Sequence, residues 1–197
     1  MIPQNLLLDR GGTFIKYKKN QKIFLEGDIP GFYYQVVQGS VRMVSLNENG
    51  KEVMDGIFKN GESFGEPVLL INEPYPLNAV ANEYTQLIKI RKEEFLKILK
   101  EFPEIHFQFT KIIARRVYNK SLVAKAISVN RPGLRVLSIL KILKNIYGIP
   151  GSENYKVELS RQQIADMIGF RVETVIRTIK RLEKKGIIKI QKGKIYL

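Results

Sequence analysis

The residues best suited to a specific chemistry lie within residues 160–186. Ser160-Arg161-Gln162-Gln163 has the form of a helix capping box, in which the serine hydroxyl and the glutamine side chain satisfy backbone amides reciprocally. Ala165, Gly169 and Val175 follow at spacings of four and six residues. Two short helices that cross at a turn need this spacing, because the alanine is small at the crossing, the glycine accepts a positive φ and the valine fills the space between the helices. The pattern therefore predicts a helix-turn-helix.

The second helix of this motif is predicted to run from Val172 to Lys185 and to end at Gly186. In a helix-turn-helix, side chains at the start of the second helix contact base edges in the DNA major groove. Arg177 suits guanine and Glu173 suits the N4 amino group of cytosine, while other side chains nearby contact phosphates. The predicted DNA contacts are Arg161, Arg171, Val172, Glu173, Thr174, Arg177 and Lys180.

The charge distribution favours this interpretation over two alternatives that the motif leaves open. The net charge is +14, and residues 130–197 hold 15 Lys and Arg against 5 Asp and Glu, a net of +10. Residues 1–129 hold 18 against 14, a net of +4. A basic segment beside a nearly balanced one is typical of a polyanion-binding domain joined to a different domain. The alternatives are that Glu173 and Arg177, four residues apart, only form a solvated ion pair, and that the motif contacts protein.

Residue patterns on either side of the motif also predict secondary structure. Residues 187–197 place Ile-rich and Tyr-containing runs on either side of Lys192-Gly193, which predicts a hairpin and makes the unit a winged helix. Residues 1–90 contain short runs rich in Ile, Val, Phe and Tyr between turn signals, which predicts a sandwich or jelly roll. Within it, Gln38-Gly39 predicts a hairpin between its flanking strands, and Asn49-Gly50 predicts a second turn.

A long helix is predicted from Pro103 to about Val129, after a shorter one over 92–100. Its apolar side chains form a nearly heptad seam, which favours a two-stranded dimer interface over a helix packed on its own sheet. The seam consists of Phe109, Ile113, Val117, Lys120, Ala124 and Ile127, and Lys120 interrupts its apolar character. Asn130-Arg131-Pro132-Gly133 is the expected boundary, with Pro-Gly ending the long helix. We therefore expect an α+β chain with a β-roll or jelly-roll domain over 1–102, a dimerisation helix over 103–130 and a winged helix-turn-helix over 131–197.

Composition excludes several functions. The chain has no Cys and one His, so disulfides, cysteine-held zinc, iron–sulfur clusters and a cysteine nucleophile are excluded. A jelly-roll enzyme would need several His ligands for its metal, so we expect no enzymatic activity and no metal site. No apolar run approaches the roughly 20 residues of a membrane span, and the N-terminus lacks a signal-peptide pattern. We therefore expect a cytoplasmic protein without a membrane partner.

Over nearly its whole length the sequence resembles the Crp/Fnr family of bacterial transcription regulators. The resemblance rests on Gly39-Ser40-Val41, Gly50-Lys51-Glu52 and Gly61-Glu62-Ser63-Phe64-Gly65-Glu66 in the first half, and on the helix-turn-helix residues in the second. It implies a sensor β-roll, a dimerising helix and a winged DNA-binding domain, with double-stranded DNA, a second copy of the chain and RNA polymerase as partners. Val172-Glu173-Thr174-x-x-Arg177 resembles the Fnr branch, which implies a palindromic operator with TTGA-like half-sites.

The resemblance also implies an effector site, formed by Gly65, Glu66, Leu77, Asn78, Lys120 and Ser121. Leu77 and Asn78 stand where cyclic-AMP binders have the Arg and Ser that hold the phosphate, and a buried phosphate without its Arg is disfavoured. Cyclic AMP is therefore not expected. An iron–sulfur cluster is excluded by the lack of Cys, and haem would depend on His106 alone, which we expect to be structural. No cofactor is predicted, and the small-molecule effector stays unidentified.

Overall fold

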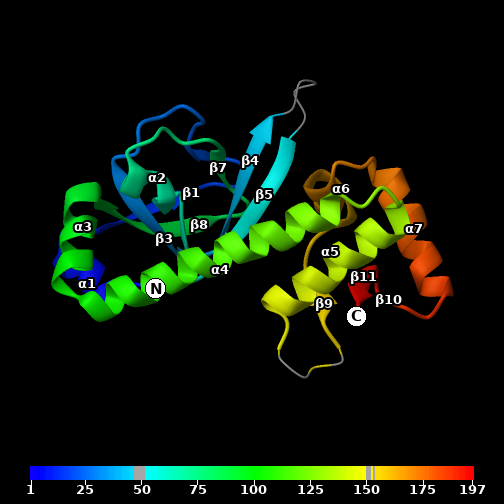
Figure 1. The fold of residues 1–197 in the computed structure, drawn as a ribbon. Helices are drawn as coiled ribbons and strands as arrows, with labels where there is room; N and C mark the ends of the chain where they lie inside the picture. The colour runs from blue at the N-terminus through cyan, green and yellow to red at the C-terminus, as the bar shows by residue number, and fades with distance from the viewer. Residues whose placement is uncertain (47–51, 150–151, 153) are drawn as a thin grey trace. The chain divides into compact units, whose positions relative to one another are not determined.

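A computed structural model describes residues 1–46, 52–149, 152 and 154–197 (Figure 1). The chain divides into two compact units, Met1–Ile113 and Ala114–Leu197. Across the described residues, no helix combines the length and the apolar character that a bilayer span requires.

The first unit is built on two four-stranded sheets whose pairings are all antiparallel. One sheet has the order β1-β8-β3-β6 and the other the order β2-β7-β4-β5. The strands are β1 Thr13–Tyr17, β2 Lys22–Phe24, β3 Phe32–Gln38, β4 Ser40–Leu46, β5 Glu52–Lys59, β6 Ser63–Phe64, β7 Asn78–Ala81 and β8 Thr85–Arg91. Strands distant in sequence are therefore neighbours, as β1 and β8 are, and this is the arrangement of a roll.

The predicted hairpin around Gly39 is wrong. β3 pairs with β8 and β6, whereas β4 pairs with β5 and β7, so the chain changes sheets at Gly39. Gly39 has φ 88°, and a Cβ there would lie 2.5 Å from the carbonyl oxygen of Tyr84. Only glycine fits this corner without displacing backbone. The Asn49-Gly50 turn lies outside the described residues, although the β4–β5 ladder on either side of it is present.

Three short helices, α1 Gln4–Asp9, α2 Glu66–Ile71 and α3 Lys92–Glu101, accompany the sheets. Two apolar clusters fill the unit. One joins α1 and α3 to β3 and β8 around Tyr33 and Phe95, whose rings stack with centroids 4.5 Å apart. The other lies inside the roll and is rich in aromatic rings.

The long helix α4 spans Pro103–Ile127 and contributes to both units. Two of its predicted seam residues pack inside the first unit. Phe109 is 3% exposed and meets Phe95 edge-on at 5.4 Å, and Ile113 packs on the same cluster. Phe109 is therefore a core residue and is not available to a second helix, whereas Ile113 is only partly buried.

The second unit contains the C-terminal half of α4 and a winged helix. Its elements are α5 Pro132–Tyr147, β9 Lys156–Val157, α6 Arg161–Ile168, α7 Val172–Lys184, β10 Lys189–Gln191 and β11 Lys194–Tyr196. Pro132 and Gly133 form the first turn of α5, and the last residue of α4 is Ile127. The prediction that Pro-Gly ends the long helix is thus wrong, because proline is accommodated at a helix start, where its missing N–H has no partner to lose.

Candidate nucleic-acid interface

The helix-turn-helix is held together at its start and at its turn. The Gln163 amide donates to Ser160 Oγ at 3.1 Å, and the Ser160 amide donates to Gln163 Oε1 at 2.8 Å, so the predicted capping box is confirmed. Gly169 ends α6 with φ 70°, and Ala165 and Val175 are fully buried between α6 and α7. Local residues therefore determine where α6 begins and where it ends.

One face of α7 is packed and the opposite face is open. Val175, Ile179 and Leu182 belong to the core of the second unit. The exposed face carries most of the predicted DNA contacts, namely Arg171, Glu173, Arg177 and Lys180. Within the part of the chain that the structure describes, no ion pair joins Glu173 to Arg177, so both side chains are presented separately.

Three predicted contacts, Arg161, Val172 and Thr174, are less accessible than the rest. Val172 is partly buried and packs on the core, and Thr174 is also half-buried. Arg171 precedes α7 as its N-cap, and its side chain gives no capping hydrogen bond. Arg171 thus places a positive charge at the start of α7, where Ser or Asp would accept a hydrogen bond from a backbone amide.

Arg161 has a structural partner that the sequence did not reveal. Its Nη1 donates to the carbonyl oxygen of Gly193 at 2.9 Å and so links the start of α6 to the turn of the wing. That turn has positive φ at Lys192 and Gly193, 46° and 75°, as a tight hairpin turn requires. The exposed lysines of the wing, which the predicted set omits, are Lys189, Lys192 and Lys194. The sequence could have indicated these lysines, because they stand among the apolar residues that predicted the hairpin.

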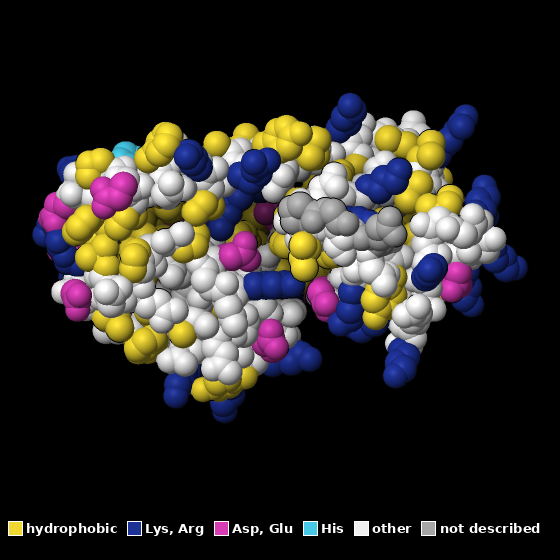
Figure 2. Space-filling view, turned by 90° about the horizontal axis from the view of Figure 1, so that it is seen from below, with side chains coloured by type: hydrophobic (Ala, Val, Ile, Leu, Met, Phe, Trp, Pro, Cys, Tyr) yellow, Lys and Arg dark blue, Asp and Glu magenta, His cyan; other side chains and the backbone are white. Residues whose placement is uncertain are grey.

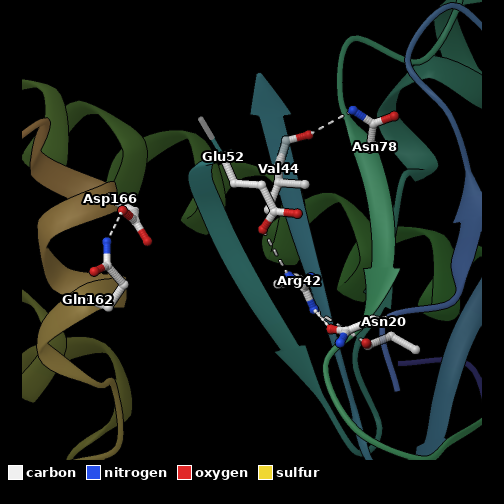
Figure 3. Close-up of polar contacts among 8 residues, drawn as sticks. Asn20, Arg42, Val44, Glu52, Asn78, Gln162 and Asp166 are labelled. Atoms are coloured by element: carbon white, nitrogen blue, oxygen red, sulfur yellow. Dashed lines mark hydrogen bonds and ion pairs between the residues drawn. The ribbon is translucent and has the colours of Figure 1, made fainter. Parts of the chain in front are cut away.

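Basic side chains recur over the second unit. Figure 2 shows Lys and Arg projecting from the part of the chain that contains α5 to β11. On the exposed side of α6, Gln162 Nε2 donates to Asp166 Oδ1 at 2.7 Å, one turn further along the helix (Figure 3). This bond orients Gln162, a neighbour of Arg161, on the surface.

Four of the six residues predicted to form the effector site have structural roles inside the roll. Asn78 Oδ1 accepts from the Glu26 amide at 3.1 Å, and Asn78 Nδ2 donates to the Val44 carbonyl oxygen at 3.4 Å (Figure 3). Leu77 packs on the aromatic cluster. Glu66 is fully buried and accepts a hydrogen bond from the Ser63 hydroxyl. These side chains therefore have structural roles in the form of the molecule seen here.

Aromatic rings fill the interior of the roll. Tyr75 is 4% exposed and stacks on Phe24 with centroids 3.6 Å apart and planes 9° apart, beside Tyr34 and Phe64. A Cβ at Gly65 would lie 2.8 Å from the Phe24 ring and 3.0 Å from Tyr75, so only glycine allows this approach. Burial raises the pKa of Tyr75, and within the described residues its hydroxyl has no hydrogen-bond partner.

Arg42 is the arginine of the β-roll that sequence reasoning did not consider. Its Nε lies 3.4 Å from Glu52 Oε2, and its Nη1 donates to Asn20 Oδ1 at 3.2 Å and to the Ala81 carbonyl oxygen at 3.3 Å (Figure 3). Val41 on the same strand belongs to the interior cluster, and alternation places Arg42 on the opposite face of the sheet. Arg42 therefore does not replace the missing phosphate-binding Arg.

The remaining two residues of the predicted effector site lie on α4 in the second unit. Lys120 and Ser121 are both exposed, and the Ser121 hydroxyl donates to the Val117 carbonyl oxygen at 3.1 Å. The predicted set is thus divided between the two units. The described residues contain no cluster of three or more His, Asp and Glu side chains suited to a metal ion.

Comparison with known proteins gives matches over both units. Residues 14–102 match the cyclic nucleotide-binding domain family, and residues 135–197 match the Crp-like helix-turn-helix domain family. The chain is 28% identical over 183 residues to the global nitrogen regulator of Nostoc sp., covering 91% of this chain and 82% of that protein. It is 27% identical over 180 residues to the cyclic AMP receptor protein of Thermus thermophilus, covering 91% and 81%.

Solved structures share the fold. A mutant of CooA from Carboxydothermus hydrogenoformans superposes with a TM-score of 0.82 at 20% identity, over 97% of this chain and 84% of that one. FixK2 from Bradyrhizobium japonicum gives a TM-score of 0.76 at 22% identity, over 94% and 92%. The order of a β-roll, a long helix and a winged helix is therefore common to these chains.

Proposed function

Because the chain belongs to the Crp/Fnr family of DNA-binding transcription regulators, we propose that it binds a palindromic operator as a dimer, under control of a small-molecule effector. The relatives are transcription regulators, consistent with a protein that is not an enzyme. RNA polymerase is the further partner proposed at the promoter. The observation that carries the proposal is the exposed edge of α7, which a capped and tightly packed helix-turn-helix presents in the basic half of the chain.

Base recognition is assigned to three side chains on α7. Arg177 donates to guanine O6 and N7, Glu173 accepts from the N4 amino group of cytosine, and Val172 contacts a thymine methyl group. The exposure of Arg177 and Glu173 and the lack of an ion pair between them support the first two assignments. Phosphate contacts are assigned to Arg161, Arg171, Thr174 and Lys180. Arg161 can fill this role while holding the wing, because one guanidinium has five N–H donors.

The dimer is assigned to a face of α4 that shares Val117 and Ala124 with the seam predicted by sequence and differs from it in its other members. Side chains spaced alternately three and four residues apart are all exposed, and they are Phe107, Thr110, Ala114, Val117, Ser121 and Ala124. Thr110 Oγ1 donates to the His106 carbonyl oxygen at 3.0 Å, and Ser121 makes the equivalent bond to Val117. With these hydroxyls satisfied inside the helix, the face is largely apolar, with small side chains between Phe107 and Val117 and beyond Val117, as a two-helix contact requires.

The test is selection of bound sequences from a random duplex library, followed by affinity measurements on the selected operator. We expect a palindrome of the TTGA…TCAA type with half-sites about 34 Å apart. Arg177→Ala should cost about 1–3 kcal/mol per half-site and reduce the preference at the G·C pair.

Arg181→Ala is the matched control, since Arg181 is exposed on the same helix one turn further from its start. It should weaken all sequences alike or have no effect. If Arg177→Ala weakens binding to the selected and the G·C-substituted operators equally, then Arg177 contacts the backbone and the assigned recognition is wrong.

A further inference from the structure

Arg135, in the first turn of α5, joins three segments of the second unit. Its Nε donates to the Val129 carbonyl oxygen at 2.7 Å, and its Nη1 donates to the Ile168 carbonyl oxygen at 3.3 Å. Its guanidinium lies over the Phe170 ring, 4.5 Å from the centroid. Val129 follows the end of α4, Ile168 is the last residue of α6, and Phe170 lies in the turn that leads to α7.

The electrostatics of this contact explain why a cation is held there. The last carbonyl groups of a helix lack partners within the helix and carry partial negative charge. Ile168 is at such an end, and the Val129 carbonyl lies just beyond another, since the Ser128 and Val129 amides still bond back to Ala124 and Ala126 of α4. One guanidinium therefore binds one carbonyl group at the end of α6 and another just beyond the end of α4.

The C-terminal half of α4 is packed into the same core as the helix-turn-helix. Ala126 is 5% exposed within that core, and Val123 packs against it. This packing fixes the distance between α4 and the winged helix but uses one small and one β-branched side chain, which constrain rotation weakly. The bonds of Arg135 add directional restraint at the point where the chain leaves α4 and again at the turn before α7.

We propose that Arg135 is a positioning residue that sets the angle between α4 and the recognition helix α7, and thereby the half-site spacing that a dimer accepts. This inference rests on the proposed function, in which α4 carries the dimer axis. A lysine cannot substitute, because it lacks both the forked pair of donors and the flat face that stacks on Phe170.

The experiment compares operators whose half-sites are moved apart or together by one base pair, a change of about 3.4 Å and about 35°. Wild type, Arg135→Gln and Arg135→Lys are measured on the selected operator and on both spacing variants. Arg131→Gln is the matched control, because Arg131 is an exposed arginine that immediately precedes the same helix. A G·C-substituted operator reports base recognition separately, and thermal melts report folding.

We expect Arg135→Gln to weaken binding to the selected operator about tenfold and to bring the three spacings within about threefold of one another. Arg135→Lys should behave similarly, and it answers the question if Arg135→Gln does not fold. The G·C preference should persist in both, and Arg131→Gln should keep the wild-type spacing preference.

If the Arg135 variants lose affinity for all spacings by the same factor, the residue only stabilises the fold and the inference is wrong. A wild-type protein without spacing preference would instead contradict the dimeric operator complex itself, and the inference would fall with it.

Discussion

Polar side chains have opposite roles in the interior of the β-roll and on the exposed edge of α7. In the roll, Asn78 is bonded to two backbone groups and Glu66 is buried against Ser63, while Tyr75 fills the space between aromatic rings. On α7, Arg177 and Glu173 are exposed. One region directs its polar groups inward to hold structure, and the other holds its structure with apolar groups and directs polar ones outward.

This difference shows when a match to a family motif indicates ligand binding. Gly65-Glu66 matches a nucleotide-binding pattern, yet Gly65 is required by the approach of Phe24 and Tyr75, and the carboxylate is held by a neighbouring serine. In the helix-turn-helix the structural roles fall mainly on Ser160, Gly169 and Val175, whereas Glu173 and Arg177 are exposed on α7. Among the predicted DNA contacts, Arg161 and Val172 also have structural partners. A match is informative about binding only where structural and binding residues are separate.

The largest expected effect is on the packed interior. Tyr75→Ala should lower the free energy of unfolding by about 3–5 kcal/mol, because it removes a buried ring stacked on Phe24 and leaves a cavity. Urea unfolding measures the change. Tyr84→Ala is the matched control, as this tyrosine is 54% exposed in the same unit and should cost little. A loss below about 1 kcal/mol for Tyr75→Ala would mean that the interior is not tightly packed there.

Alkaline pH should also act on the interior of the roll. Burial raises the pKa of Tyr34 to about 12 from 10.0, and it raises that of Tyr75. Because the folded state holds these protons more tightly, their stabilising effect is complete below pH 10 and is lost as the pH rises through 12. Because two pKa units separate the folded and unfolded values, the effect is about 3 kcal/mol for Tyr34.

Circular dichroism during alkaline titration tests this expectation. Tyr34→Phe should move the unfolding midpoint to higher pH, whereas Tyr84→Phe, at an exposed position, should not. Equal midpoints for wild type and Tyr34→Phe would contradict the role given to Tyr34.

At Arg171, the N-cap of α7, we expect one substitution to raise stability and to weaken DNA binding. Arg171→Ser supplies the missing acceptor at the start of α7 and should stabilise the second unit by about 1 kcal/mol. It also removes a proposed phosphate contact, so it should weaken binding to all DNA sequences alike and reduce the salt dependence. Thermal melts and binding at several salt concentrations measure both. Unchanged DNA affinity would show that Arg171 does not contact phosphate.

The smallest effect is expected from removing one oxygen atom. Tyr75→Phe keeps the stacked ring but deletes a buried hydroxyl that has no partner among the described residues, so it should stabilise the first unit by up to about 1 kcal/mol. Urea unfolding with Tyr84→Phe as the control measures the gain. A clear loss of stability would show that the hydroxyl has a partner.

Local signals allowed the prediction of the helix-turn-helix, since the capping box and the glycine that ends α6 act over three or four residues. Contacts between distant segments were not predictable in this way. Gly39 looks like a hairpin turn until β8 is placed beside β3, and Phe109 looks like a dimer contact until Phe95 is placed beside it. Arg135 was missed because its carbonyl partners lie 6 and 33 residues away and belong to backbone that no side-chain pattern marks.

The small side chains on the exposed face of α4 have a consequence for gene expression. Phe107 and Val117 are the large apolar side chains of this face, and Ala114, Ser121 and Ala124 bury little apolar area, so two chains joined by it would be held less strongly than by a seam of leucines. Operator occupancy would then follow the square of the free chain concentration wherever monomers predominate. The amount of protein synthesised would itself be a regulatory input, and modest changes in expression would give steep changes in the response.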